Sequence, residues 1–135
     1  MGYCMYQEDS DFFIKAKDKD GALAAIRALA GKETITDSSG RHFSWVSQGF
    51  EKSPTFNTIM GEWRWQVSED TNGDVVAISF EGEKIGDEET LFKAIAPFVK
   101  KGSFIEMRGE DGLMWRWIFD GKTVKEITAK IMWEE

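Results

Sequence analysis

Cysteine, histidine and proline are scarce in this sequence. Its 135 residues include one cysteine, Cys4, one histidine, His42, and two prolines. A single cysteine cannot close a disulfide within the chain, which fits a reducing compartment. One cysteine and one histidine are too few for a zinc site with the usual ligands, and the stretch DTNGD lacks the later glutamate of a calcium loop. We therefore expect no bound metal and no cofactor.

Long apolar runs are missing as well. No apolar stretch is long enough to cross a bilayer. The acidic start, MGYCMYQEDSDFF, lacks the basic residues that open a signal peptide. We therefore expect a cytoplasmic protein without a membrane partner. The length suits one domain, residues 1–135, that is large enough to bury a real core.

Basic residues are in the minority: 24 acidic residues oppose 17 basic ones, for a net charge of -7. This balance argues against direct nucleic-acid binding, which relies on a basic surface. The ordinary explanation of the charge is solubility. The alternative is mimicry of a nucleic-acid backbone, although acids and bases are interspersed and the most acidic stretch, EGEKIGDEET, is short.

Catalytic motifs are not evident either. The sequence has no Gly-x-Ser-x-Gly segment and no phosphate-binding glycine loop. Cys4 and His42 could form a nucleophile pair, but we expect Cys4 to be a buried, inert thiol and His42 to be a surface residue. The remaining acid–base option is a carboxylate pair, Glu106 and Glu110, beside Arg108.

Helical spacing of apolar residues predicts a helix over residues 18–32, DKDGALAAIRALAGK. Either Asp18 or Asp20 could cap its start, and Gly31 stands where a glycine commonly ends a helix. One or two helical turns are also expected after Ser53, which would be the N-cap and is followed by proline at the first helical position.

A second long helix is predicted over residues 87–102, DEETLFKAIAPFVKKG, with Asp87 as its N-cap. Pro97 lacks an N–H and crowds the preceding turn, so we expect a kink or an early end there. The apolar stripe of this helix consists of Leu91, Ile95 and Phe98, with Phe92 and Val99 at its edges.

Strands are expected at the N-terminus and in a central hairpin. GYCMY and DFFIK suggest two short strands separated by a break at residues 8–10. Residues 31–42 have the composition of a loop, and residues 43–46 (FSWV) that of a short strand. Residues 62–82 predict a hairpin that turns at Asn72 and Gly73 in a type I′ loop. Its expected cross-strand pairs are Trp65 with Phe80, Val67 with Ile78, and Arg64 with Glu81.

Residues 103–109, 113–119 and 122–128 predict a three-stranded meander. A three-residue loop at 110–112, with glycine last, sets three pairs: Met107 with Trp115, Ile105 with Trp117, and Glu106 with Arg116. A two-residue loop at Asp120 and Gly121 would set Trp117 opposite Val124. The predicted inner face holds Ile105, Met107, Leu113, Trp115, Trp117, Phe119 and Val124. The predicted outer face holds Glu106, Arg108, Arg116 and Lys125, which are the candidate binding residues.

The loop length decides where the tryptophans point. A two-residue loop would place Trp115 and Trp117 beside Glu106 and Arg108, as an exposed aromatic and charged platform. The glycine position favours the three-residue loop, and burial of large apolar side chains stabilises the fold. We therefore expect Trp65, Trp115 and Trp117 to be buried.

The motif Trp-Arg-Trp opens a strand in both hairpins, so a weak internal duplication and a shared packing solution both remain open. The segment GSFIEMRGEDGLMWRWIFDG, together with the start MGYCMYQEDSDFFI, resembles a group of small uncharacterised bacterial proteins. The resemblance covers roughly the first fifteen and last forty residues. It implies kinship and no activity.

These patterns predict an α+β fold: an antiparallel sheet of hairpins and a meander, with two main helices packed on one face. The lack of catalytic groups favours a non-catalytic binding or regulatory protein whose partner is another protein. A homodimer is compatible with the sequence. The alternatives are an acidic inhibitor that occupies a nucleic-acid site on another protein, and a small enzyme with a carboxylate acid or base.

Overall fold

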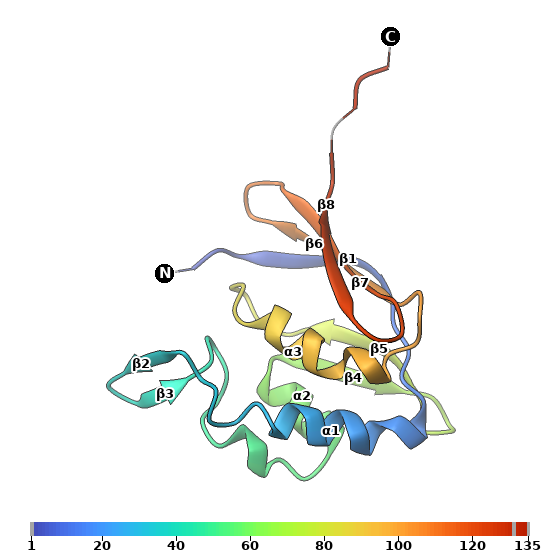
Figure 1. Ribbon diagram of the computed structural model, residues 1–135. Helices are drawn as coiled ribbons and strands as arrows, with labels where there is room; N and C mark the ends of the chain where they lie inside the picture. The colour runs from blue at the N-terminus through green and yellow to red at the C-terminus, as the bar shows by residue number, and fades with distance from the viewer. Residues whose placement is uncertain (1, 131, 135) are drawn as a thin grey trace.

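A four-stranded antiparallel sheet lies over the helices in the computed structural model, which describes residues 2–130 and 132–134 (Figure 1). The strand order is β1-β6-β7-β8, with β1 Met5–Asp11, β6 Phe104–Gly109, β7 Met114–Phe119 and β8 Val124–Thr128. Two-stranded sheets join β4 Trp65–Glu69 to β5 Val75–Phe80, and β2 Ile35–Asp37 to β3 Gly40–His42. The helices are α1 Lys19–Arg27, α2 Phe56–Glu62 and α3 Glu88–Ile95, with 3-10 turns at Ala16–Asp18, Phe50–Lys52 and Ala96–Phe98. The predicted α+β class is confirmed.

The register of β6 and β7 follows from the loop that ends in Gly112. This glycine has a φ of 87°, the left-handed conformation that a three-residue loop requires at its last position. Met107 therefore faces Trp115, Ile105 faces Trp117, and Glu106 faces Arg116. All three predicted pairs are confirmed. The alternative platform of exposed tryptophans is wrong, because both indoles point into the core.

The register of β7 and β8 differs by two residues from the predicted one. Asp120 accepts hydrogen bonds at 2.7 and 2.9 Å from two backbone N–H groups just beyond it, and these bonds lower its pKa to about 2. The loop therefore consists of residues 121–122, and Val124 faces Phe119 instead of Trp117. Because side chains alternate with a period of two, this shift leaves each side chain on its predicted face.

The first strand is continuous, so the predicted break at residues 8–10 is wrong. β1 pairs with β6 along its whole length, and its register shifts between Gln7 and Asp9. Glu8 is thus the extra residue of a β-bulge, which accommodates a polar stretch without ending the strand.

The central hairpin keeps its predicted Trp65–Phe80 and Val67–Ile78 pairs, but its loop is longer than predicted. Gly73 has a positive φ and Asn72 does not, which excludes a type I′ turn at these two residues. A bulge near Glu69 compensates for the longer loop and preserves the register.

Gln7 joins this hairpin to the main sheet. Its side-chain Nε2 donates to the carbonyl of Ile78 at 2.9 Å, and its Oε1 accepts from the N–H of Phe80 at 2.8 Å. A single bridge between Ile14 and Val75 adds a further connection. The β1 edge of the main sheet is therefore covered by the hairpin.

The helices are shorter than the sequence patterns suggest. α1 ends at Arg27, and tighter turns follow it before the chain reaches Gly31, whose φ is 91°. α3 ends at Ile95, so the predicted early end before Pro97 is confirmed. The N-cap of α2 is Thr55 and not Ser53.

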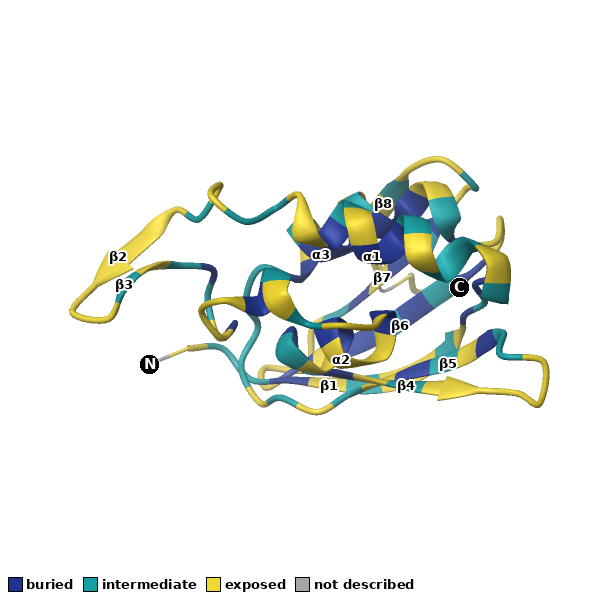
Figure 2. Ribbon diagram, turned by 90° about the horizontal axis from the view of Figure 1, so that it is seen from below, coloured by how far each residue is buried: buried dark blue, intermediate teal, exposed yellow. Residues whose placement is uncertain are grey.

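The segment predicted as a loop at residues 31–42 contains the β2–β3 hairpin, and the strand predicted at residues 43–46 is wrong. The hairpin projects from the body, and most of its residues are exposed (Figure 2).

The core consists of the inner sheet face and the helices packed against it. Its largest fully buried side chains are Trp63, Trp65, Trp117, Phe12, Phe92 and Phe119. Trp115 is also buried, so the predicted burial of three tryptophans is confirmed. Leu113 is 48% exposed, contrary to prediction, because it lies in the turn before β7.

Candidate functional site

The outer face of the main sheet is the surface opposite the helices. We define it by the alternating residues that the register places there: Tyr6, Asp9 and Asp11 from β1, Phe104, Glu106 and Arg108 from β6, Met114, Arg116 and Ile118 from β7, and Lys125 and Ile127 from β8. It includes all four candidate residues named from the sequence. Tyr6, Arg108, Arg116, Lys125 and Ile127 are exposed, and Glu106 is half-buried.

Two arginines on this face lie against aromatic rings. The guanidinium carbon of Arg116 lies 4.9 Å from the ring centroid of Phe104, and that of Arg108 lies 5.3 Å from the centroid of Tyr6. Nε of Arg116 donates to Glu106 at 2.7 Å. Such cation–π contacts hold the guanidinium planes in place before any partner arrives.

Arg108, like Arg116, also forms an ion pair with a glutamate, and this glutamate belongs to the bulge in β1. Nε of Arg108 donates to the carboxylate of Glu8, the extra residue of the bulge. This charge-assisted hydrogen bond raises the pKa of Arg108 above its usual value, so the side chain is a permanent cation. The bulge therefore positions a charge on the outer face, between β1 and β7.

The charges on the outer face are segregated. Glu8, Asp9 and Asp11 place negative charge along β1, whereas Arg116 and Lys125 place positive charge on β7 and β8. A surface of this kind can orient a partner whose own charges are complementary.

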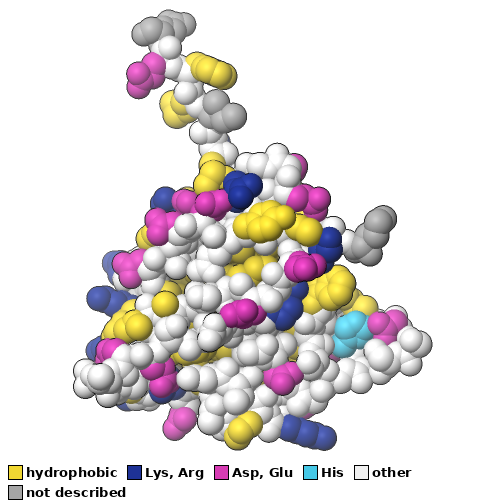
Figure 3. Space-filling view, turned by 180° about the vertical axis from the view of Figure 1, so that it is seen from behind, with side chains coloured by type: hydrophobic (Ala, Val, Ile, Leu, Met, Phe, Trp, Pro, Cys, Tyr) yellow, Lys and Arg dark blue, Asp and Glu magenta, His cyan; other side chains and the backbone are white. Residues whose placement is uncertain are grey.

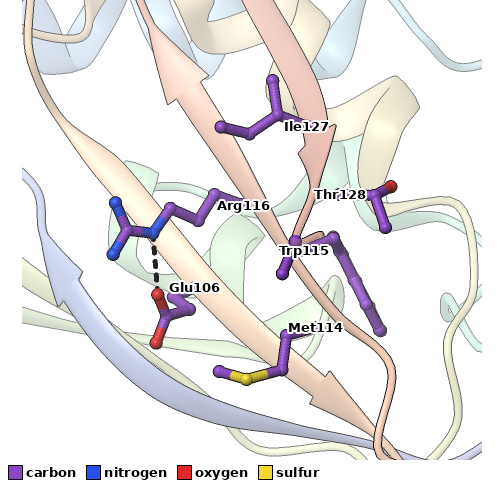
Figure 4. A pocket seen from close by; sticks show the side chains of 7 residues that line it. Glu106, Met114, Trp115, Arg116, Ile127 and Thr128 are labelled. Atoms are coloured by element: carbon purple, nitrogen blue, oxygen red, sulfur yellow. Dashed lines mark hydrogen bonds and ion pairs between the residues drawn. The ribbon is translucent and has the colours of Figure 1, made fainter. Parts of the chain in front are cut away.

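A shallow hollow of about 240 Å³ lies between β7 and β8 on this face (Figure 4). Its lining residues are Glu106, Met114, Trp115, Arg116, Ile127, Thr128 and Ala129. Figure 4 shows the Arg116–Glu106 pair and Met114 on one side of β7, with the Trp115 side chain directed away from them. The hollow thus combines an apolar floor with a charged rim.

The carboxylates considered as an acid–base pair have different hydrogen-bond partners. Glu106 accepts from Arg116, and Glu110 accepts from the backbone N–H of Cys4 at 2.7 Å. Arg108 is engaged with Glu8. Each of the three groups therefore has a separate structural partner.

Cys4 and His42 also have separate partners. Cys4 is half-buried, so the predicted full burial is wrong, and Nζ of Lys84 donates to its sulfur at 3.0 Å. This hydrogen bond raises the pKa of Lys84. His42 lies in the β2–β3 hairpin, where its Nε2 is 3.4 Å from a carboxylate oxygen of Asp37.

An ion pair between the half-buried Arg64 and the buried Glu88 was not predicted from the sequence. Nη2 of Arg64 lies 2.8 Å from Oε2 of Glu88, and Nη1 donates to the carbonyl of Lys84 at 2.7 Å. The other carboxylate oxygen of Glu88 accepts from the N–H of Gly86 at 2.6 Å. Burial raises the pKa of Glu88, although the Gly86 N–H and Arg64 oppose that shift. These bonds hold the loop before α3, and little of the pair's own surface is exposed.

Arg64 was predicted to face Glu81 across the hairpin. The backbones of these residues are hydrogen-bonded at 2.8 Å, but Arg64 has a φ of 72°. This rare conformation lies outside the β region and turns the side chain toward Glu88. The predicted ion pair is therefore wrong at the side-chain level.

Replacement of Glu106 by glutamine tests whether the outer ion pair is structural. Because the Arg116 side chain is 46% exposed, we expect the free energy of unfolding to change by less than about 1 kcal/mol. Urea denaturation followed by tryptophan fluorescence measures it. A loss of several kcal/mol would show that this face is not open to solvent.

Within the described residues, no group of three or more histidine, cysteine, aspartate or glutamate side chains could hold a metal ion. None of the helices that the structure describes has both the length and the apolar character of a membrane span. Comparisons with protein families, with curated proteins and with solved structures find no match to this chain. The bacterial kinship drawn from the C-terminal motif stays a prediction, and the function must be argued from the outer face itself.

Proposed function

We propose that the protein is a non-catalytic binding or regulatory protein that contacts another protein through the outer face of its main sheet. The observation that carries this proposal is the pair of arginines held against Phe104 and Tyr6 on an exposed sheet. Tyrosine and arginine are enriched at the energetic centres of protein interfaces. Rigid side chains also lose less conformational entropy when a partner binds.

The shape of the face supports a macromolecular partner. Small-molecule sites are typically enclosed clefts of roughly 300–1,000 Å³. The hollow beside Arg116 is smaller, at about 240 Å³, and is lined mainly by side chains of two neighbouring strands. It suits one inserted side chain of a protein partner better than a metabolite.

The other two functions have less support. A nucleic-acid mimic needs a dense array of carboxylates, yet Arg108, Arg116 and Lys125 share the outer face with the acidic residues. A carboxylate enzyme needs convergent groups, yet Glu106 and Glu110 contact different partners.

Photocrosslinking tests the proposal in two steps. A photoreactive residue at Ile118, on the outer face, should capture a partner in cells, and the same residue at Ala24, exposed on α1, should not. The captured protein is then purified, and its affinity is measured by calorimetry.

The double charge reversal Arg108→Glu and Arg116→Glu should weaken that affinity by at least about tenfold, since removal of interface arginines commonly costs over 1.4 kcal/mol. Lys93→Glu, on the exposed side of α3, is the matched control and should bind like the wild type. If the purified partner binds the outer-face variant and the wild type equally well, the proposed face is wrong.

A further inference from the structure

β8 forms an open edge of the main sheet. The β1 edge is covered by the β4–β5 hairpin through Gln7 and the Ile14–Val75 bridge. β8 lies at the opposite edge, and among the residues that the structure describes no strand pairs with its outer side. Met132 and Trp133, beyond the end of β8, are 87% and 89% exposed and so do not pack against this edge. Figures 1 and 3 show their segment leading away from the sheet.

Every second residue of β8 directs its backbone groups toward the open edge. The N–H of Ala129 donates to the carbonyl of Met114 at 3.0 Å, so the backbone of Ala129 faces β7. Because the direction of these groups alternates along a strand, every second residue counted back from Ala129 also faces β7. The residues between them direct N–H and carbonyl groups away from β7, where a further strand can bond to them. These residues are Val124, Glu126 and Thr128.

An apolar hollow lies beside this edge on each face of the sheet. The hollow of about 240 Å³ on the outer face is bordered at the edge by Ile127 and Ala129. A second hollow, of about 150 Å³, lies on the inner face and is bordered at the edge by Glu126 and Thr128. Since side chains alternate between the faces of a strand, a strand beside β8 would direct its side chains to the two hollows in turn. The other walls of the inner hollow are Tyr3, Ile85, Leu113 and Trp115.

The inner hollow is held in shape by the N-terminal segment. The N–H of Ile85 donates to the carbonyl of Tyr3 at 2.7 Å, and the hydroxyl of Tyr3 donates to the carboxylate of Asp111. The ring centroid of Tyr3 lies 6.4 Å from that of Trp115. These contacts form the hollow before any partner binds, which lowers the entropic cost of binding.

We propose that the protein partner contributes an extended segment that pairs antiparallel with β8 as a fifth strand of the main sheet. The inference rests on the proposed function, because it takes the partner to be a protein, and it names the element that binds. Backbone hydrogen bonds at such an edge supply affinity, and hollows for alternate side chains supply specificity. The antiparallel direction is that of the other strand pairs of this sheet, and it is the more stable pairing.

The charges of β8 define the chemistry of the segment. Lys125 is exposed on the outer face and Glu126 on the inner face. Like charges directly opposite each other destabilise a sheet, and opposite charges stabilise it. The segment therefore carries an acidic residue opposite Lys125 and a basic residue opposite Glu126. A strand with other charges is disfavoured, which also protects the edge from unselective pairing.

Antiparallel pairing sets the order of the residues in the segment. From its N-terminus, an apolar residue lies opposite Thr128, an aromatic one opposite Ile127, a basic one opposite Glu126 and an acidic one opposite Lys125. The first side chain enters the inner hollow, and the second enters the outer hollow. The second residue is aromatic because a ring is long enough to reach across the neighbouring side chain of Ile127.

Two peptides test this order. NMR titrations of the isotopically labelled full chain measure its affinity for acetyl-Ser-Val-Phe-Lys-Glu-Val-Ser-amide and for the same peptide with lysine and glutamate exchanged. We expect the first to bind about tenfold more tightly, since the exchange reverses both cross-strand charge pairs. The double variant Lys125→Glu with Glu126→Lys should invert this preference. Glu89→Lys with Lys93→Glu, an equal exchange on the exposed side of α3, is the matched control and should leave the preference unchanged.

Amide hydrogen exchange locates the bound peptide. In the free protein, the amides of Glu126 and Thr128 face the open edge and should exchange fast, whereas those of Ile127 and Ala129 are bonded to β7 and should exchange slowly. At a peptide concentration that fills about nine-tenths of the sites, exchange at Glu126 and Thr128 should slow about tenfold. Exchange at Ile127 and Ala129 should change much less.

Equal affinity for the two peptides, no binding of either, or slow exchange at Glu126 and Thr128 in the free protein would overturn the proposal. In the last case, sedimentation of the full chain shows whether a second copy occupies the edge. Photocrosslinking at Ile118 remains a separate test of the proposed function. A partner captured there without peptide binding would leave that function standing and remove only the strand, whereas peptide binding without a captured partner would support the edge and contradict the outer face.

Discussion

Replacement of Glu88 by alanine is expected to destabilise the protein by about 3–5 kcal/mol, the range for removing one partner of a buried ion pair. Glu88 is 1% exposed, and its carboxylate accepts from both Arg64 and the N–H of Gly86. Alanine would leave the guanidinium and this N–H without their acceptor inside the protein. Urea denaturation at neutral pH measures the loss, and a change below about 1 kcal/mol would contradict the buried geometry.

The Glu88→Gln variant keeps the shape of the side chain but removes its ionisable group. Its stability as a function of pH therefore tests the pKa shift of Glu88. Burial raises the pKa of Glu88 in the folded state above its ordinary value of 4.5. The folded protein therefore holds the proton more tightly than the unfolded chain does. The proton-linked part of its contribution to stability is fully present below pH 4.5, and it is lost as the pH rises through the folded-state pKa. The contacts with Arg64 and Gly86 that alanine removes are separate from this part. The free energy of unfolding of the glutamine variant should lack this component, whereas a parallel pH dependence in both proteins would contradict the assigned shift.

Replacement of Trp117 by alanine should cost a similar amount, about 3–5 kcal/mol. Trp117 is 1% exposed, and its ring centroid lies 4.9 Å from that of Phe92 on α3. It also contacts Trp115 edge to face, with centroids 6.0 Å apart. Alanine would therefore open a cavity between the sheet and its main helix. Thermal and chemical denaturation should both report the loss.

Trp117→Phe is the informative control, because the indole N–H of Trp117 is buried without a hydrogen-bond partner among the described residues. Phenylalanine keeps most of the aromatic contact and removes this unsatisfied donor. We expect it to be clearly less destabilising than alanine. If both substitutions cost the same, the indole N–H must have a partner, such as an ordered water molecule.

The pairing of β6 with β7 could be predicted residue by residue because the chemistry of its loop is local. Gly112 fixes the length of the first loop, and the loop fixes every pair of β6 and β7. The second loop was misplaced by two residues because Asp120 holds the backbone beyond it through its carboxylate. The loop at Asn72 and Gly73 was also predicted incorrectly, because a bulge at Val76 in β5 accompanies a longer loop while the register of the other pairs is kept.

The features that escaped prediction depend on contacts between distant segments. Arg64 and Glu88 belong to different elements, and no local pattern marks either of them as buried. The polar stretch around Glu8 was predicted as a strand break. Its carboxylate is stabilised there by an ion pair with Arg108, which lies 100 residues away in the sequence and leaves no local pattern. The outer face itself could be predicted, since strand alternation and one correct register determine which side chains share it.

The pairing of β1 with β6 also constrains how the chain can fold during synthesis. Met5 lies opposite Gly109, so the first strand has no sheet partner until the ribosome has released most of the chain. The helices and the β4–β5 hairpin consist of nearer contacts and can form earlier. Closing such a long loop costs conformational entropy before the contacts between β1 and β6 have formed. We therefore expect the completion of the sheet to be the slow step of folding. Until then, the side chain of Met5, which is buried in the folded protein, lacks the neighbouring strand that pairs with it.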